Sequence, residues 1–181
     1  MKLLITVALL LTLVACATVA PDLARLYSFE EGSAYQPPVV LIHGAFGSRL
    51  QGDDGVEKWP GSLSRILLDD YRDLALGIDP ASLQPLPDQL TVQGMTDRIA
   101  GQDYYGRIRE VLETVGGYQL QVAGIPPPAS GRHYYSFEYD WRQDNTLSAA
   151  QLHRYLDQIR RDHKQPELRV DVVAHSMGGL V

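Results

Sequence analysis

A β-branched run that leads directly into a serine turn constrains this chain more than any other feature. Leu168–Ala174 is such a run, and His175-Ser176-Met177-Gly178-Gly179 follows it at once. The run predicts a buried strand of a parallel sheet, with a helix starting after the turn. Small residues two positions before and after Ser176 let a strained strand-to-helix turn close, as an exposed nucleophile requires. The competing interpretation is a serine that caps the helix beginning at Met177.

A second short apolar run, Val39–Ile42, predicts another buried strand, and it ends in the loop His43-Gly44-Ala45-Phe46-Gly47-Ser48. Acyl transfer through a tetrahedral intermediate needs backbone N–H donors where the oxyanion forms. We expect the N–H groups of Ala45 and Met177 to be these donors, and Phe46 to contact substrate. The alternative interpretation is a plain glycine-containing turn after a strand.

The remaining patterns alternate strands and helices, which indicates an α/β fold with a mostly parallel sheet and helices on both faces. Helices are predicted at about Ser62–Tyr71, at Tyr104–Val115 and from the capping-box pattern Ser148–Gln151 onward, and a strand at His133–Trp141. Residues from about 50 to 101 are rich in turn-forming prolines and glycines and are predicted to be an irregular insertion.

Composition excludes several classes of protein. The chain has 181 residues, 45% of them hydrophobic, which is enough to bury one core. Because 22 Asp and Glu outnumber 16 Lys and Arg and no basic run occurs, no nucleic-acid partner is expected. The sequence contains no metal-ligand cluster, phosphate loop or dinucleotide fingerprint, so neither a metal nor another cofactor is expected.

The first residues predict export. Met1-Lys2 is positively charged, and residues 1–15 read as a signal peptide because Leu3–Ala15 is apolar but too short to span a bilayer comfortably. Leu13-Val14-Ala15-Cys16 resembles the lipobox of bacterial lipoproteins, which implies a lipid anchor on Cys16 and a tether over residues 16–37. Because Ala17, and not an aspartate, follows the cysteine, the resemblance to lipoproteins also implies sorting to the outer membrane. The alternative is a conventional signal peptide and a periplasmic product.

A family resemblance rests on the second half of the chain. Tyr139-Asp140-Trp141-Arg142, the predicted helix after it, and Val172–Val181 resemble the lecithin:cholesterol acyltransferase branch of the α/β-hydrolase lipases, and Tyr104–Tyr118 is similar too. The resemblance implies an α/β-hydrolase domain over residues 38–181. It also implies an acyl-ester or phospholipid substrate and an acyl-enzyme on Ser176. Trp141 would line the substrate pocket. The alternative is a packed Trp beside an Asp–Arg pair.

A serine nucleophile needs a histidine to take its proton and a carboxylate to orient that histidine. In this fold both follow the serine in the chain, whereas here only Met177–Val181 follow it. We therefore expect the N-terminal part of a longer hydrolase or acyltransferase, or a remnant, truncated after the serine turn. The histidines present are expected to be structural or exposed. The alternative is a non-catalytic lipoprotein that keeps the scaffold for binding.

Overall fold

The computed structural model describes residues 22, 25 and 36–181. The predicted signal peptide, the lipid anchor at Cys16 and most of the tether lie outside the described residues. All helices and strands named below belong to one compact unit, residues 31–181. Within the described residues, no helix combines the length and the hydropathy that crossing a membrane requires.

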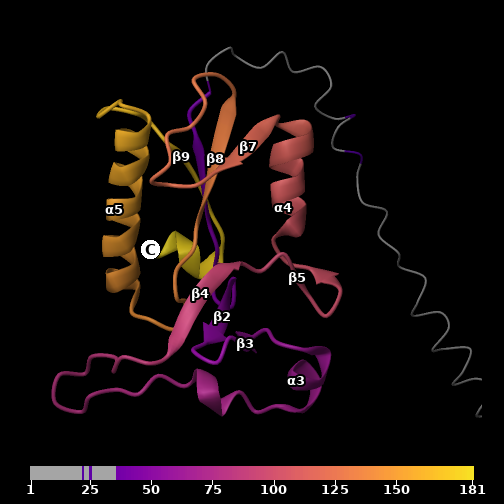
Figure 1. Cartoon of the computed structure of the whole chain (residues 1–181), viewed down its shortest axis with the longest axis vertical. Coiled ribbons are helices and arrows are strands. Elements are labelled where there is room, and N and C mark those ends of the chain that lie inside the picture. Colours follow the sequence, from indigo (N-terminus) through magenta and orange to yellow (C-terminus); the bar gives the residue numbers. More distant parts are fainter. Residues whose placement is uncertain (1–21, 23–24, 26–35) are drawn as a thin grey trace, which may run out of the picture. The chain divides into compact units, whose positions relative to one another are not determined.

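Four parallel strands form the central sheet in the order β7-β8-β1-β9 (Figure 1). They are β1 (Val39–Ile42), β7 (Tyr118–Gln121), β8 (Arg132–Phe137) and β9 (Asp171–Ala174). β1 pairs with β8 on one side and with β9 on the other. The mixed α/β class with a parallel sheet is thus confirmed. After β1 the chain forms β7 and β8 on one side of β1 and then returns to form β9 on the other side. In sheets with this topology, ligands bind at the carboxyl ends of the strands.

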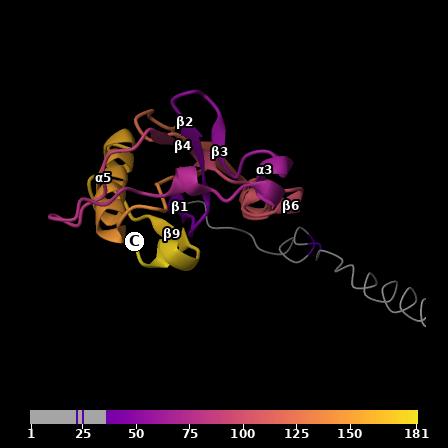
Figure 2. The same ribbon diagram turned by 90° about the horizontal axis from the view of Figure 1, so that it is seen from below.

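Helices cover both faces of this sheet. α4 (Gly106–Glu110) continues as the π-helix η3 (Val111–Val115) on one face, and α5 (Asn145–Asp162) packs on the other (Figure 1). Seen from below, β1 and β9 lie between α5 and the segments around α3 and β6 (Figure 2). Alternate side chains of β1 point to opposite faces: Val40 and Ile42 pack with Ile159 of α5. Val39 and Leu41 join a second core cluster on the other face.

The segment predicted as an irregular insertion is more regular than expected. It contains a three-stranded antiparallel sheet in the order β3-β2-β4. Its elements are β2 (Ser48–Gly52), β3 (Glu57–Trp59), α3 (Leu63–Leu68), the 3-10 helix η2 (Arg72–Leu74), β4 (Leu90–Met95), β5 (Arg98–Ile99) and β6 (Gln102–Asp103). The three strands of that sheet are short and partly exposed, so their hydrophobic pattern is weak. The predicted helix is confirmed but ends at Leu68, and Ser62 caps it.

Several predicted boundaries shift. α5 begins before the predicted capping box: Asp144 caps it by accepting a hydrogen bond from the N–H of Thr146, and Ser148 is buried inside the helix. β8 ends at Phe137, before Trp141. The predicted buried strand at 168–174 shortens to β9, and its side chains are exposed, including 50% of Val172. The reason is that β9 is the edge strand of the described sheet and pairs with β1 alone.

Candidate active site

Ser176 lies on a tight turn between β9 and the 3-10 helix η4 (Ser176–Gly179). Its φ is +54°, in the left-handed region that residues with a β-carbon rarely adopt. Such a conformation costs about 1 to 3 kcal/mol and persists only where the surroundings impose it, which is common at functional sites. The residue is exposed. No side chain caps η4, so the alternative interpretation of Ser176 as a helix cap is wrong.

Two glycines allow the loop after β1 to lie against the serine turn. A β-carbon on Gly44 would come within 2.7 Å of the β-carbon of Ser176. A β-carbon on Gly178 would overlap the carbonyl oxygen of His43. Only glycine fits at these two contacts, so the glycine spacing in both motifs has a direct geometric cause. The alternative of a plain turn after β1 does not account for this close approach.

The peptide group between Gly44 and Ala45 is held through its carbonyl oxygen. That oxygen lies 3.1 Å from the N–H of Gly47, which donates to it, and 2.8 Å from Nδ1 of His43. The N–H of a trans peptide points away from the carbonyl of the same peptide, so the N–H of Ala45 faces away from these contacts. Within residues 36–181, neither Ala45 nor Met177 donates its N–H to a protein acceptor. Both groups remain predicted oxyanion donors.

His43 fixes the loop, which is a structural role of the kind expected for the histidines of this chain. Its ring is fully buried and stacks on Tyr139 with centroids 4.3 Å apart. The N–H of Tyr139 donates to Nε2 of His43 at 3.3 Å, which leaves the proton on Nδ1 to bind the carbonyl of Gly44. Burial lowers the pKa of His43 from 6.5 to about 4, so the ring is neutral near pH 7.

Two tyrosines contact the same loop through their hydroxyl groups. Tyr105 Oη accepts a hydrogen bond from the N–H of Gly44 at 2.7 Å and also bonds Nδ1 of His175 at 2.7 Å. Tyr104 Oη donates to the carbonyl of Ala45 at 3.1 Å. The sequence predicted Tyr104 and Tyr105 only as the first residues of a helix, and not as contacts of this loop. The one available signal was the pair of adjacent tyrosines at the head of that helix.

Aromatic side chains gather beside the loop. The ring of Phe46 lies 4.4 Å from Trp141 and 5.0 Å from Trp59, measured between centroids. Trp59 donates its indole N–H to the carbonyl of Phe46, and Trp141 donates to that of Ser48. Phe46 is 45% exposed, so this cluster presents an apolar surface to solvent. The two predicted substrate-contacting residues are thus brought together, and Trp59, which was not predicted to take part, joins them.

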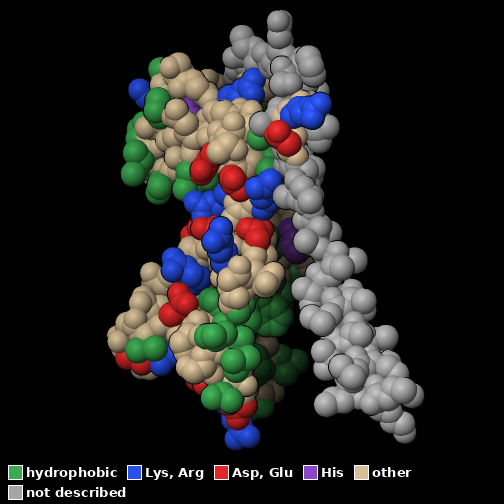
Figure 3. Space-filling view, turned by 90° about the vertical axis from the view of Figure 1, so that its right-hand side faces the viewer, with side chains coloured by type: hydrophobic (Ala, Val, Ile, Leu, Met, Phe, Trp, Pro, Cys, Tyr) green, Lys and Arg blue, Asp and Glu red, His purple; other side chains and the backbone are tan. Residues whose placement is uncertain are grey.

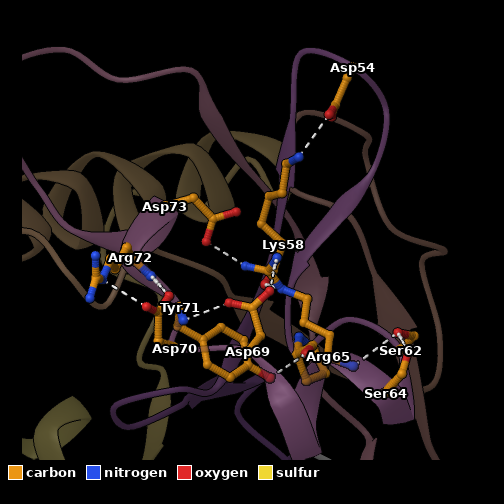
Figure 4. A network of polar contacts seen from close by, with 11 residues as sticks. Asp54, Lys58, Ser62, Ser64, Arg65, Asp69, Asp70, Tyr71, Arg72 and Asp73 are labelled. Carbon is orange, nitrogen blue, oxygen red and sulfur yellow. Dashed lines mark hydrogen bonds and ion pairs between the residues drawn. The ribbon is translucent and has the colours of Figure 1, made fainter.

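A polar network around Arg65 is connected to this cluster through Tyr71 (Figure 4). Arg65 of α3 donates to the carbonyl of Lys58, pairs with Asp69 at 3.0 Å and also pairs with Asp73. Its guanidinium lies 4.9 Å from the ring centre of Tyr71, and that ring packs 5.4 Å from Trp59. The network therefore links α3 to the aromatic cluster.

The Asp–Arg pair predicted beside Trp141 also forms. Arg142, with only 4% of its side chain exposed, pairs with Asp140 and with Asp88 at 2.6 Å each. It also donates to the carbonyl of Leu74. The alternative interpretation, a packed Trp beside an Asp–Arg pair, is thus confirmed, whereas a role of Trp141 in lining a substrate pocket stays a prediction.

The other histidines lie away from Ser176. His133 is at the amino end of β8, whereas Ser176 follows the carboxyl end of β9. His163 caps α5 and bonds the hydroxyl of Tyr135 at 3.0 Å, and both histidines line a cavity of about 850 Å³ at that opposite edge. His153 is exposed on α5. In the described part of the chain, no histidine hydrogen-bonds Ser176, and no group of acidic, His or Cys side chains could hold a metal ion.

No protein-family model matches this chain, and no curated protein matches its sequence. The fold and the site define the class as a mixed α/β protein with an exposed, strained serine at the carboxyl edge of a four-stranded parallel sheet.

Proposed function

We propose that this chain carries the nucleophile of a serine hydrolase or acyltransferase with the α/β-hydrolase fold, similar to the lecithin:cholesterol acyltransferase branch. One observation carries the proposal: Ser176 adopts φ +54° on a strand-to-helix turn, with Gly44 of the preceding loop packed against it. Such a turn exposes the serine hydroxyl, and the predicted N–H donors belong to Ala45 and Met177, which directly follow Gly44 and Ser176 in the chain; acyl transfer requires a nucleophile and donors of this kind.

In the proposed reaction, Ser176 Oγ attacks the carbonyl carbon of an acyl ester and the carbonyl oxygen becomes an oxyanion. The N–H groups of Ala45 and Met177 donate to that oxyanion. The leaving alcohol departs with a proton, and water or an acceptor alcohol then releases the acyl group from Ser176. The serine proton passes to a histidine oriented by a carboxylate, and in this fold both follow the nucleophile in the chain.

Apolar surfaces near the site favour an acyl-ester or phospholipid substrate. Phe46 and Trp141 form one wall beside the predicted oxyanion donors. Apolar side chains also gather over the lower part of the face shown in Figure 3, on the side where α3 lies in Figure 1, and Leu63, Leu67 and Leu68 of α3 are exposed. Burial of an acyl chain against such surfaces stabilises binding by about 0.8 kcal/mol per methylene.

We also propose that the protein is exported and held on the outer membrane through a lipid on Cys16, or released to the periplasm if it is processed conventionally. Metabolic labelling with an alkyne fatty acid tests the anchor. We expect the wild type to carry the label and Cys16→Ala to lose it. An unlabelled wild type would contradict the lipid anchor and leave the periplasmic alternative.

A fluorophosphonate probe tests the nucleophile in the protein expressed from its complete coding region. We expect the probe to modify Ser176, Ser176→Ala to abolish labelling, and Ser130→Ala, at an exposed loop serine, to retain it. Circular dichroism would show that both variants are folded. Labelling that survives Ser176→Ala would contradict the proposal. A folded wild type that is not labelled would favour the non-catalytic lipoprotein that uses the scaffold for binding.

A further inference from the structure

A single tyrosine hydroxyl connects the two segments that carry the predicted oxyanion donors. Tyr105 precedes α4 as its N-cap and is buried, with 7% exposure. Its Oη lies 2.7 Å from the N of Gly44 and 2.7 Å from Nδ1 of His175. Gly44 directly precedes Ala45 in the loop after β1, and His175 directly precedes Ser176. The hydroxyl therefore ties that loop to the serine turn.

The direction of both hydrogen bonds follows from the chemistry of the groups. The N–H of Gly44 can only donate, so Tyr105 Oη accepts from it. The hydroxyl proton is then available to Nδ1 of His175, which requires a neutral imidazole with its proton on Nε2. Burial raises the pKa of Tyr105, which keeps the hydroxyl protonated. Every polar group in this chain of contacts has a defined donor or acceptor role.

The backbone of Tyr105 is fixed to the same loop by a second route. Its N–H donates to the carbonyl oxygens of Thr96 and Asp97, at 3.2 Å each. The N–H of Thr96 in turn donates to the carbonyl of Gly47 at 2.8 Å. The ring edge also lies against His43, with centroids 6.3 Å apart. Tyr105 is thus held rigidly against both ends of the turn that contains Ala45.

We propose that Tyr105 is a positioning residue that sets the distance between Ser176 and the N–H of Ala45, by holding Gly44 and His175 on one hydroxyl. This inference rests on the proposed function. The ring of Tyr105 supplies the packing against Val39 and Leu41. The hydroxyl is not needed for that packing, so its contribution can be separated from the stability of the core.

Tyr105→Phe keeps the ring and removes the hydroxyl. The variant is measured in the protein from the complete coding region, acting on a short acyl ester. We expect kcat to fall about tenfold or more, which is a smaller loss than the 10²- to 10³-fold cost of losing an entire oxyanion donor. We expect KM and the melting temperature to change little. Tyr135→Phe is the matched control, because it also removes a tyrosine hydroxyl bonded to a histidine, at the opposite edge of the sheet. It should leave kcat unchanged.

A second readout does not depend on activity. Amide hydrogen exchange at Gly44 should be faster in Tyr105→Phe, because that N–H loses its acceptor. The inference is overturned if the wild type is labelled at Ser176 and Tyr105→Phe changes neither kcat nor the exchange rate of the Gly44 amide. An equal loss of kcat in Tyr135→Phe would also overturn it. A wild type with no labelling of Ser176 would instead overturn the proposed function.

Discussion

Gly178 and Gly179 are adjacent at the serine turn and differ sharply in the room around them. A β-carbon on Gly178 would overlap the carbonyl of His43, whereas one on Gly179 would have no described atom within 4 Å outside its own turn. We expect Gly178→Ala to lower stability by about 1 to 3 kcal/mol and to slow labelling of Ser176, because the loop after β1 must move. Gly179→Ala should change neither. Urea unfolding and labelling rates measure both effects, and equal behaviour of the two variants would contradict the proposed packing.

The buried His43 makes stability depend on pH. Folding lowers its pKa from 6.5 to about 4, so between these values the unfolded chain binds a proton that the folded chain does not. The free energy of unfolding should therefore be fully retained above pH 6.5 and fall as the pH drops toward 4, by about 3 kcal/mol from this group. Urea unfolding across this range measures the slope. The slope should be smaller in His43→Asn, and an unchanged slope would contradict the assignment.

At the scale of single residues, sequence reasoning selected the candidates whose proposed roles depend on local pattern. Ser176, Ala45 and Met177 follow from short motifs, because a turn of this kind constrains its immediate neighbours. Tyr105 and Trp59 were missed, because their contacts join residues 61 and 13 positions apart in the chain. No local pattern encodes such a contact.

At the scale of elements, the cap of α5 is the clearest test. Asp144 accepts hydrogen bonds from both the N–H and the hydroxyl of Thr146, and these bonds lower the pKa of Asp144. We expect Asp144→Ala to lower the urea midpoint and Asp144→Asn to retain most of it, because an amide oxygen still accepts. A larger loss in Ser148→Ala than in Asp144→Ala would instead support the capping box predicted from sequence.

The elements that sequence reasoning predicted well are those with strong patterns. β1 is a run of four buried residues, and α5 has apolar residues at helical spacing. The antiparallel sheet of β2, β3 and β4 was not predicted, because its strands are short and partly exposed, and because the pairing of β2 with β4 joins segments about 40 residues apart. The start of α5 was misplaced because two capping patterns lie close together and only tertiary packing, which buries Ser148, selects between them.

At the scale of the whole molecule, Arg142 joins the antiparallel sheet region to the central sheet. Its guanidinium contacts Asp140 after β8, and Asp88 and the carbonyl of Leu74 in the inserted segment. Removing one partner of a buried ion pair leaves the other uncompensated. We therefore expect Arg142→Met to lower stability by about 3 kcal/mol.

The matched control for Arg142 is Arg72→Met, because Arg72 is 89% exposed and pairs only at the surface with Asp70. A surface pair of this kind contributes about 0 to 1 kcal/mol. Chemical denaturation compares the two variants. Equal losses would show that Arg142 does not link the two regions.

The central claim is that Ser176 forms a covalent acyl-enzyme, and trapping that intermediate tests it most directly. The protein expressed from its complete coding region would be mixed with a p-nitrophenyl acyl ester, quenched with acid, digested and mapped by mass spectrometry. We predict an acyl adduct on the peptide that contains Ser176, absent in Ser176→Ala. Ester turnover with no adduct on that peptide, or an adduct that persists in Ser176→Ala, would contradict the account.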